Sequence, residues 1–276
     1  MTSYHGGKQK TGKIIAEVIL KNVANKDILL KGYCEPFCGM LGVYKHMYRY
    51  LSPSGVHVPK GGEAHERDFV APRFLFKAGD MNESLILMWK KCQKGWIPPV
   101  KCSESCYNRL KKQTKPSAIK GFVGHQYSFG GQYFKGYRGL YKNNDNYTKA
   151  SEDVFDIANE LKKVKFKHGN FKQFSNLKNY IIYCDPPYSR SNYYFDEEHN
   201  RLYFDHIDFW NWCLEMGKNN IVFVSEYSCP IKDKRIKLVY GKPVKLTGST
   251  PKDRKRIEKI YMISTIGRRQ SRISPP

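Results

Sequence analysis

Apolar residues recur at helical spacing in five stretches of the chain, residues 12–24, 41–51, 83–92, 150–163 and 205–217. Short apolar runs typical of buried strands lie between them, at residues 32–35, 74–78, 180–184 and 220–225, with a last strand at 259–266. Helices that alternate with buried strands favour a mostly parallel sheet that is covered on both faces. The sequence therefore predicts an α/β fold.

Two stretches interrupt this alternation. Residues 52–73 form a polar loop rich in glycine, proline and histidine, which we interpret as an insertion. Residues 95–149 differ more strongly, because ten lysines and arginines stand against two acids between Lys101 and Lys149, interleaved with aromatic residues. The glycine-rich part of this segment, residues 129–139, cannot form a regular helix.

The length of 276 residues favours one α/β domain with an insertion over two independent domains. We expect residues 1–94 and 150–276 to form a catalytic domain and residues 95–149 to form an inserted subdomain.

The net charge of +23 indicates a polyanionic partner, because lysines and arginines that neutralise phosphates release condensed counterions. The alternative is a surplus of charge that serves solubility, or the lysine bias of an AT-rich genome. The positive charge is clustered, however, which favours nucleic acid. Residues 231–259 form a further basic region, with eleven lysines and arginines against three acids, which would lie against duplex phosphates or be a solvated charged surface.

In the segment 95–149, basic side chains would hold phosphates while aromatic side chains stack on bases or wedge between them. The alternative is a small aromatic core beneath a solvated basic surface. The candidate nucleic-acid-binding residues are Lys111, Lys112, Lys115, Tyr127, Ser128, Phe129, Gln132, Lys135 and Arg138.

The N-terminus lacks the apolar stretch of a secretory signal, and no segment approaches the roughly 20 apolar residues of a membrane span. We therefore expect a soluble protein of the cytoplasm, or of a host cytoplasm or viral replication compartment, and no membrane partner. The eight cysteines are then expected to be mostly free thiols. The spacings Cys34/Cys38 and Cys102/Cys106 leave zinc as an alternative, but we expect no metal site.

The strongest chemical motif is Asp185-Pro186-Pro187-Tyr188, which directly follows a buried strand. This position lies at the carboxyl edge of a parallel sheet, where open α/β sheets bind ligands. The Asp185 carboxylate and the Pro186 carbonyl, on a turn stiffened by two prolines, can accept both hydrogens of an aromatic amine. Tyr188 offers a face on which an extruded base can stack. The alternative is an ordinary Asp-Pro turn.

A second motif, residues 35–42, is a strand followed by a glycine-bearing turn that opens a helix. Glycine there allows a ligand to approach the backbone. Asp80 ends the next strand, where an acid can bind ribose hydroxyls. The alternative is that Asp80 or Asn82 only caps the helix that begins near Glu83.

These motifs stand in one order along nearly the whole chain: residues 4–8 (Tyr-His-Gly-Gly-Lys), residues 35–39, residues 79–82, the basic insertion and Asp185 to Tyr188. In this order the chain resembles the Dam-like, alpha-group DNA adenine-N6 methyltransferases, including phage and large-virus members. The resemblance implies a Rossmann-like methyltransferase sheet with an inserted target-recognition subdomain. It also implies S-adenosylmethionine as cofactor and duplex DNA as partner, and it allows a cognate restriction endonuclease as a further partner.

Carried over position by position, the resemblance implies a cofactor site made of Tyr4, Lys8, Glu35, Phe37, Gly39, Asp80, Asn170, Phe171 and Asp185. In this site the Lys8 ammonium would lie near the methionine carboxylate. The catalytic loop would be Asp185, Pro186, Pro187 and Tyr188. Two departures from the family pattern are Leu41, where many relatives have a second glycine, and Asn170, where an acid is common.

The resemblance implies that a target adenine leaves the duplex and that its amine takes the methyl group directly, without a metal or a covalent enzyme intermediate. Two enzymatic alternatives are methylation of cytosine N4 and methylation of an RNA amine, because the same turn fits any aromatic amine. A catalytically inactive DNA-binding protein with a structural or regulatory role is the alternative outside the enzymes.

Overall fold

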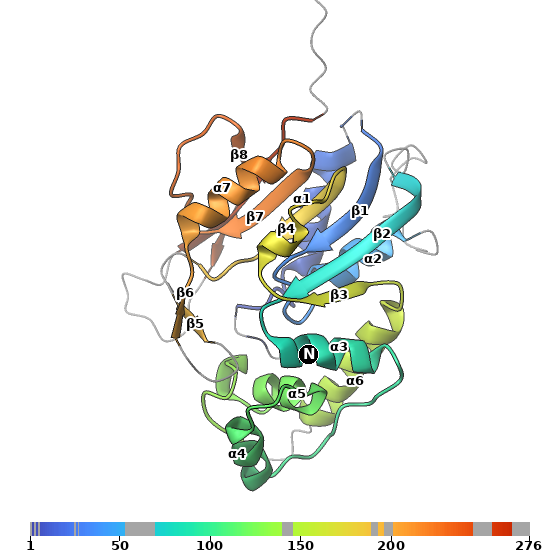
Figure 1. Cartoon of the computed structure of the whole chain (residues 1–276), viewed down its shortest axis with the longest axis vertical. Coiled ribbons are helices and arrows are strands. Elements are labelled where there is room, and N and C mark those ends of the chain that lie inside the picture. Colours follow the sequence, from blue (N-terminus) through green and yellow to red (C-terminus); the bar gives the residue numbers. More distant parts are fainter. Residues whose placement is uncertain are drawn as a thin grey trace, which may run out of the picture.

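The computed structural model describes residues 2, 4, 6–24, 26, 28–52, 70–139, 146–188, 193–195, 201–244 and 256–266. The main element within them is a seven-stranded sheet (Figure 1). Its strands are β1 (Leu30–Glu35), β2 (Val70–Asp80), β3 (Lys165–His168), β4 (Tyr180–Cys184), β7 (Ile221–Glu226), β8 (Ile236–Val244) and β9 (Arg256–Ile263).

The sheet has the order β3-β2-β1-β4-β7-β9-β8, and its first five strands are parallel. Within this sheet β9 runs the other way, paired antiparallel to β7 and β8. The chain winds outward from β1 through β2 to β3 and then continues on the other side of β1 with β4. This reversal is the topological switch point at which open α/β sheets leave a crevice.

Helices cover both faces of the sheet, as the strand residues show by their alternation. In β4, Ile181 and Tyr183 belong to the core cluster that also holds buried residues of α1 (Gly12–Ala24), α2 (Tyr44–Leu51) and α3 (Glu83–Cys92). Ile182 and Cys184 belong to a second cluster with α7 (His206–Met216). Burial of successive residues on opposite faces explains why this strand is a continuous apolar run.

Three further helices lie together at the lower end of Figure 1: α4 (Glu104–Lys112), α5 (Ala118–Gln126) and α6 (Asn146–Glu160). Gly121 of α5 lies against the backbone of α3, where an added Cβ would be 2.3 Å from the Ser84 carbonyl oxygen. Buried Phe122 and Val154 join the same core cluster as the sheet residues. The helical segment therefore shares its core with the sheet, and its status as a separate subdomain stays a prediction.

The remaining elements are short. The 3-10 turns η2 (Phe129–Gly131) and η3 (Phe171–Phe174) each follow a polar N-terminal residue, and β5 (Tyr193–Phe195) pairs antiparallel with β6 (Arg201–Tyr203). No helix among the described residues is long and apolar enough to cross a membrane.

The structure confirms the α/β fold and the mostly parallel sheet, and several predicted elements agree closely. The helices predicted at 12–24 and 83–92 and the strand predicted at 180–184 have the predicted bounds. The end of the predicted loop 52–73 was wrong, because β2 begins at Val70; residues 53–69 lie outside the described residues. Helices α4 and α5 and strand β8 were not predicted.

The close approach of α5 to α3 predicts a measurable effect of Gly121→Ala. Alanine favours a helix over glycine by roughly 1 kcal/mol, so propensity alone would stabilise the variant. The clash of its Cβ with the Ser84 carbonyl should outweigh this and lower the free energy of unfolding by about 1–3 kcal/mol. Urea unfolding measures the change. The control is Gly139→Ala, whose Cβ would meet no atom of the described residues closer than 3.8 Å; equal stability of the two variants would contradict the prediction.

Candidate functional site

The crevice at the switch point contains a cavity of about 910 Å³. The turn after β1 and the turn after β4 both line it, because the carboxyl ends of neighbouring parallel strands meet at one edge of the sheet. The structure brings all the predicted cofactor and catalytic residues to this cavity: Tyr4, Lys8, Glu35, Phe37, Gly39, Asp80, Asn170, Phe171, Asp185, Pro186, Pro187 and Tyr188.

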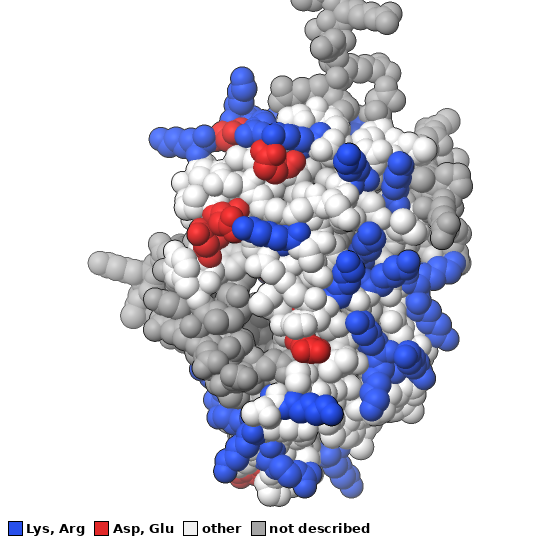
Figure 2. Space-filling view, viewed as in Figure 1, with Lys and Arg blue, Asp and Glu red and all other residues white. Residues whose placement is uncertain are grey.

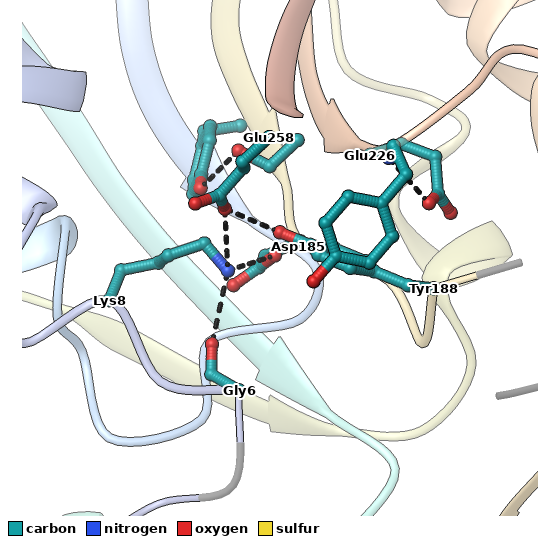
Figure 3. Close-up of polar contacts among 9 residues, drawn as sticks. Gly6, Lys8, Asp185, Tyr188, Glu226 and Glu258 are labelled. Carbon is teal, nitrogen blue, oxygen red and sulfur yellow. Dashed lines mark hydrogen bonds and ion pairs between the residues drawn. The ribbon is translucent and has the colours of Figure 1, made fainter. Parts of the chain in front are cut away.

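A compact ionic cluster lies beside the turn after β4 (Figure 3). The Lys8 ammonium lies 2.8 Å from Asp185 Oδ1 and 3.1 Å from Glu258 Oε1, and it also donates to the Gly6 carbonyl oxygen at 3.0 Å. An ammonium group has three hydrogens, so these three acceptors can occupy all of its donors. The expected contact of Lys8 with a cofactor carboxylate would require one of them to give way.

Tyr188 completes this cluster. Its hydroxyl donates to Glu258 Oε1 at 2.6 Å, and the Lys8 ammonium lies 4.9 Å from the centre of its ring. The Tyr227 ring meets Tyr188 in a T-shaped contact with centroids 4.6 Å apart. The predicted stacking residue is therefore held by contacts with β9, with the N-terminal segment and with the residue that follows β7.

Burial and charge act in opposite directions in this cluster. Burial raises the pKa of Asp185 above its usual value, and the Lys8 ammonium only partly offsets this. Burial alone would lower the pKa of Lys8, but the carboxylates of Asp185 and Glu258 outweigh it and raise the pKa. Lys8 therefore stays protonated, and Asp185 becomes protonated at a higher pH than an exposed aspartate.

Asp80 links the glycine turn to the start of α3. Its Oδ2 accepts from the Gly39 backbone N–H and its Oδ1 from the Asn82 N–H, both at 3.0 Å. Asn82 is the N-cap, since its side chain accepts from the Leu85 N–H at 2.9 Å. Burial raises the pKa of Asp80 although these backbone hydrogen bonds oppose the shift. Asp80 thus fixes the turn and also lines the cavity, so its structural role does not exclude a binding role.

The turn after β1 has left-handed backbone at two positions. Gly39 has a φ of +44°, and a Cβ there would lie 2.8 Å from the Tyr4 ring. Leu41 has a φ of +57°, a conformation that glycine adopts without cost and leucine rarely adopts. Leu41 is one of the two departures from the family pattern, and its side chain is fully buried in the core.

Aromatic rings form one wall of the cavity. Phe37 lies 5.7 Å from Phe171 between ring centroids, and both rings contact Phe204 and Phe209. Asn170 accepts from the Lys172 N–H at 2.9 Å and so caps the turn that presents Phe171.

Glu35 ends β1 beside the same cavity. It is buried and accepts from the Tyr33 hydroxyl at 2.6 Å, and burial raises its pKa well above the usual value. The carboxyl group is therefore held in place by its neighbour on the strand, at the point where the glycine turn begins.

The predicted DNA-binding residues occupy three kinds of position. Gln132 and Lys135 line the cavity. Lys111, Lys112 and Lys115 are exposed, at the end of α4 and just after it, where basic side chains gather at the lower end of Figure 2. Phe129 is a large apolar side chain that is 63% exposed. These positions are compatible with contact to a partner.

Tyr127 and Ser128 are a correction, because both are buried. The Tyr127 ring stacks on Tyr147 with centroids 3.8 Å apart, and the Ser128 hydroxyl donates to the Gly124 carbonyl oxygen at 2.7 Å. Arg138 is half-buried and lies over the Tyr147 ring at 5.5 Å. For this part of the insertion the structure thus favours the alternative in which the aromatic side chains are buried, here in the core cluster that is shared with the sheet.

Several residues of the site were not predicted. Glu258 lies in a basic region of the sequence, and no local pattern distinguishes it. His125 of α5 lines the cavity and contacts the Tyr4 ring at 4.7 Å, and burial lowers its pKa to about 4. Tyr203 and Tyr227 also line the cavity, and Tyr203 is 67% exposed.

All eight cysteines are free thiols. Among the residues that the structure describes, no group of three or more His, Cys, Asp or Glu side chains is placed to hold a metal ion. Cys34 and Cys184 lie in the core beneath the site, packed with Ile182 and Val222.

The sequence model of the D12 class N6 adenine-specific DNA methyltransferases matches residues 118–256, just over half of the chain. No curated protein sequence matches the chain.

Solved structures resemble the chain only weakly. The protein lmo1582 of Listeria monocytogenes has a TM-score of 0.40 at 9% identity, covering 96% of this chain and 61% of its own. YhhF of Escherichia coli has 0.37 at 10%, covering 94% and 89%. The rRNA methyltransferase AviRa of Streptomyces viridochromogenes has 0.35 at 10%, covering 91% and 84%.

The double acceptor role of Asp80 predicts that Asp80→Asn is destabilising. The amide retains one acceptor oxygen, so one of the two backbone N–H groups would face an NH₂ group and lose its hydrogen bond. We expect the free energy of unfolding to fall by about 1–3 kcal/mol, measured by urea denaturation. Asp208→Asn is the control, because Asp208 forms an exposed pair with Lys172 and should cost less than about 1 kcal/mol. A loss at position 80 no greater than at position 208 would contradict the role of Asp80.

Proposed function

The chain belongs to the D12 class N6 adenine-specific DNA methyltransferase family, and from this premise we propose that it methylates the N6 amine of adenine in duplex DNA. The observation that carries the proposal is the position of Asp185-Pro186-Pro187-Tyr188, in the cavity at the switch point of the sheet. An aromatic amine that enters this cavity meets the Asp185 carboxylate, whose side chain is 16% exposed, at the edge of β4.

The protein is a methyltransferase, and its cofactor is S-adenosylmethionine, which supplies a methyl group on a positively charged sulfur. The residues of the cavity fit this molecule. The volume of the cavity, about 910 Å³, is in the range of cofactor sites. Carboxylates of Glu35, Asp80 and Asp185 offer acceptors for ammonium and hydroxyl groups, and the rings of Phe37 and Phe171 offer an aromatic wall. Asp80 would bind the ribose, and Phe171 would lie near the adenine ring.

In the proposed reaction a C–N bond forms at the adenine amine, the bond between the methyl group and sulfur breaks, and the amine loses one proton. Asp185 would accept one amine hydrogen and the Pro186 carbonyl the other, which favours the pyramidal nitrogen that can attack. Lys8 and the Tyr188 hydroxyl both hydrogen-bond to the Asp185 carboxylate, and a carboxylate has about four acceptor directions. Asp185 therefore has capacity left for the amine.

The target base must leave the duplex to reach Asp185. The aromatic side chains Tyr188, Tyr203 and Tyr227 line the cavity and would provide stacking surfaces for it. Tyr203 is the most exposed of them and would meet the base first.

Duplex DNA would be held by the basic segments. Lys111, Lys112 and Lys115 lie exposed on the helical insertion, with Phe129 as an exposed apolar wedge. Lys237 and Lys242 are exposed on β8, within the basic region 231–259, of which residues 245–255 lie outside the described residues. A paired restriction endonuclease and a viral source stay predictions.

The direct test is transfer of labelled methyl groups to unmethylated genomic DNA, with the nucleosides identified by mass spectrometry. We expect N6-methyladenine from the wild type and none above background from Asp185→Ala, which should still bind S-adenosylmethionine in calorimetry. The ionised Asp185 is the acceptor and burial raises its pKa, so activity should fall on acidification at a pH above the ordinary aspartate value of about 3.9.

Other outcomes of this test identify the alternatives. Detection of N4-methylcytosine would identify cytosine as the substrate in place of adenine. Label found only on RNA would identify an RNA amine as the substrate. A protein that binds DNA but neither binds S-adenosylmethionine nor transfers a methyl group would be an inactive DNA-binding module. Full turnover by Asp185→Ala would remove Asp185 from the mechanism.

The exposed lysines of the insertion predict a change in salt dependence. Replacing Lys111, Lys112 and Lys115 by alanine should weaken DNA binding and reduce the slope of log K against log salt by about 0.9 for each phosphate that the variant no longer neutralises. Fluorescence anisotropy with a labelled duplex at several salt concentrations measures both. As a matched control, the three exposed lysines Lys162, Lys163 and Lys218 lie outside the insertion and should leave the slope nearly unchanged when replaced. Equal slopes for the two triple variants would place the DNA elsewhere.

A further inference from the structure

Glu258 lies far from the motifs of the site in sequence but next to them in space. It belongs to β9, opposite Lys242 of β8. Its side chain is 15% exposed and points toward Lys8 and the turn after β4 (Figure 3). The same oxygen, Oε1, accepts from the Tyr188 hydroxyl at 2.6 Å and lies 3.1 Å from the Lys8 ammonium.

These contacts determine where two residues of the site can lie. The Lys8 ammonium has three N–H donors, and three neighbouring acceptors surround it: the Gly6 carbonyl, Asp185 and Glu258. Its position is therefore fixed from three sides. The Tyr188 hydroxyl has Glu258 as its acceptor, while the ring is limited by Lys8 and Tyr227. Of the contacts that the structure describes, removal of Glu258 would leave the ammonium with Asp185, the Gly6 carbonyl and the face of the Tyr188 ring.

We propose that Glu258 is a positioning residue of the methyl-transfer site, which holds the Lys8 ammonium and the Tyr188 ring on either side of Asp185. By sharing the ammonium, Glu258 keeps it from pairing with Asp185 alone and so preserves the capacity of Asp185 to accept an amine hydrogen. The inference rests on the proposed function for its effect on turnover, but the positions of Lys8 and Tyr188 can be tested without any substrate.

The charge of Glu258 should also affect the titration of Asp185. Among the described residues, the titratable groups that interact with Asp185 are Lys8 and Tyr4 of the N-terminal segment, Glu35 of β1, Tyr183 and Cys184 of β4, Tyr188 of its own turn and Glu258 of β9. Burial is the largest cause of the raised pKa of Asp185, Lys8 lowers it, and the negative charge of Glu258 raises it further. Removal of this charge should lower the pKa of Asp185.

Two substitutions separate the charge of Glu258 from its hydrogen bond. Glu258→Gln has the same shape and can still accept from the Tyr188 hydroxyl, but it has no charge. We expect kcat to fall by no more than about tenfold, and the acid limb of kcat/KM to move to lower pH, because activity needs ionised Asp185. Glu258→Ala removes both interactions and should lower kcat by about 10²-fold, with the Kd for S-adenosylmethionine changed less than about threefold.

A double-mutant cycle tests the contact with Tyr188. Tyr188→Phe removes only the hydroxyl that Glu258 accepts from. The effects of Glu258→Ala and Tyr188→Phe on kcat should then be less than additive, since both remove the same hydrogen bond. The control is Glu215→Gln, which breaks an exposed pair with Lys218 on α7 and should leave kcat and the pH profile unchanged.

A measurement without substrate tests the position of Lys8. Trace acetylation with acetic anhydride, followed by peptide mass spectrometry, reports the reactivity of each lysine amine. Lys8 should be strongly protected in the wild type and in Glu215→Gln, and several-fold more reactive in Glu258→Gln and Glu258→Ala, because its ammonium loses a charged partner. If Glu258→Ala fails to fold, the isosteric Glu258→Gln decides.

The two proposals fail in different ways. Wild-type protein that transfers no methyl group, with Glu258-dependent protection of Lys8, would overturn the proposed function and leave the positioning role intact. Unchanged Lys8 reactivity in both Glu258 variants would overturn the positioning role, as would an active wild type whose kcat and acid limb do not respond to either substitution.

Discussion

The reversal of winding between β1 and β4 is the constraint on which the site depends. The connections that return from parallel strands pass over one face of the sheet or the other. At the reversal, the connections that follow β1 and β4 lead to opposite sides of the sheet, so a crevice opens at the carboxyl ends of these two strands. The glycine turn after Glu35 and the proline turn at Asp185 meet there although about 150 residues separate them. Lys8 then joins the N-terminal segment to Asp185, which lies 177 positions away in the sequence. Because a buried ammonium without a partner is costly, this pairing also holds the N-terminal segment against the sheet.

The sequence predicts an element well when the burial pattern of that element's own residues determines it, and poorly when contacts with distant segments determine it. The strand at 180–184 and the helix at 83–92 were predicted correctly because their burial patterns are apolar and continuous or periodic. Helix α5 was missed because Lys120, His125 and Gln126 are buried in it, so polarity gives no guide to its buried positions. Helix α4 buries only Tyr107 and Leu110, too few for a period to show. Glu258 could not be found, because its role depends on β9 being placed beside β7, which no local pattern records.

The insertion illustrates why a composition can indicate a partner and still misassign residues. An aromatic and basic segment must first bury its own apolar rings, and Tyr127 and Tyr147 lie in the core cluster that the insertion shares with the sheet. The same rings that could stack on bases are the best residues for a small core, since each buries a large area. Only side chains that the core leaves outside, such as Phe129, can reach a partner. Exposure, which the sequence does not contain, separates the two groups.

The sign of the charge changes between the surface and the cavity. The chain as a whole has a net charge of +23, yet the described lining of the cavity has five acids, Glu35, Asp80, Asp185, Asp205 and Asp208, against the two bases Lys8 and Lys135. A positive surface attracts the phosphates of a duplex over roughly a Debye length. An acidic cavity repels those phosphates at close range but accepts a neutral base and favours a cationic sulfur. For the proposed duplex substrate, this charge pattern would hold the backbone outside the cavity while a single base enters, which is the separation that chemistry on an extruded base requires.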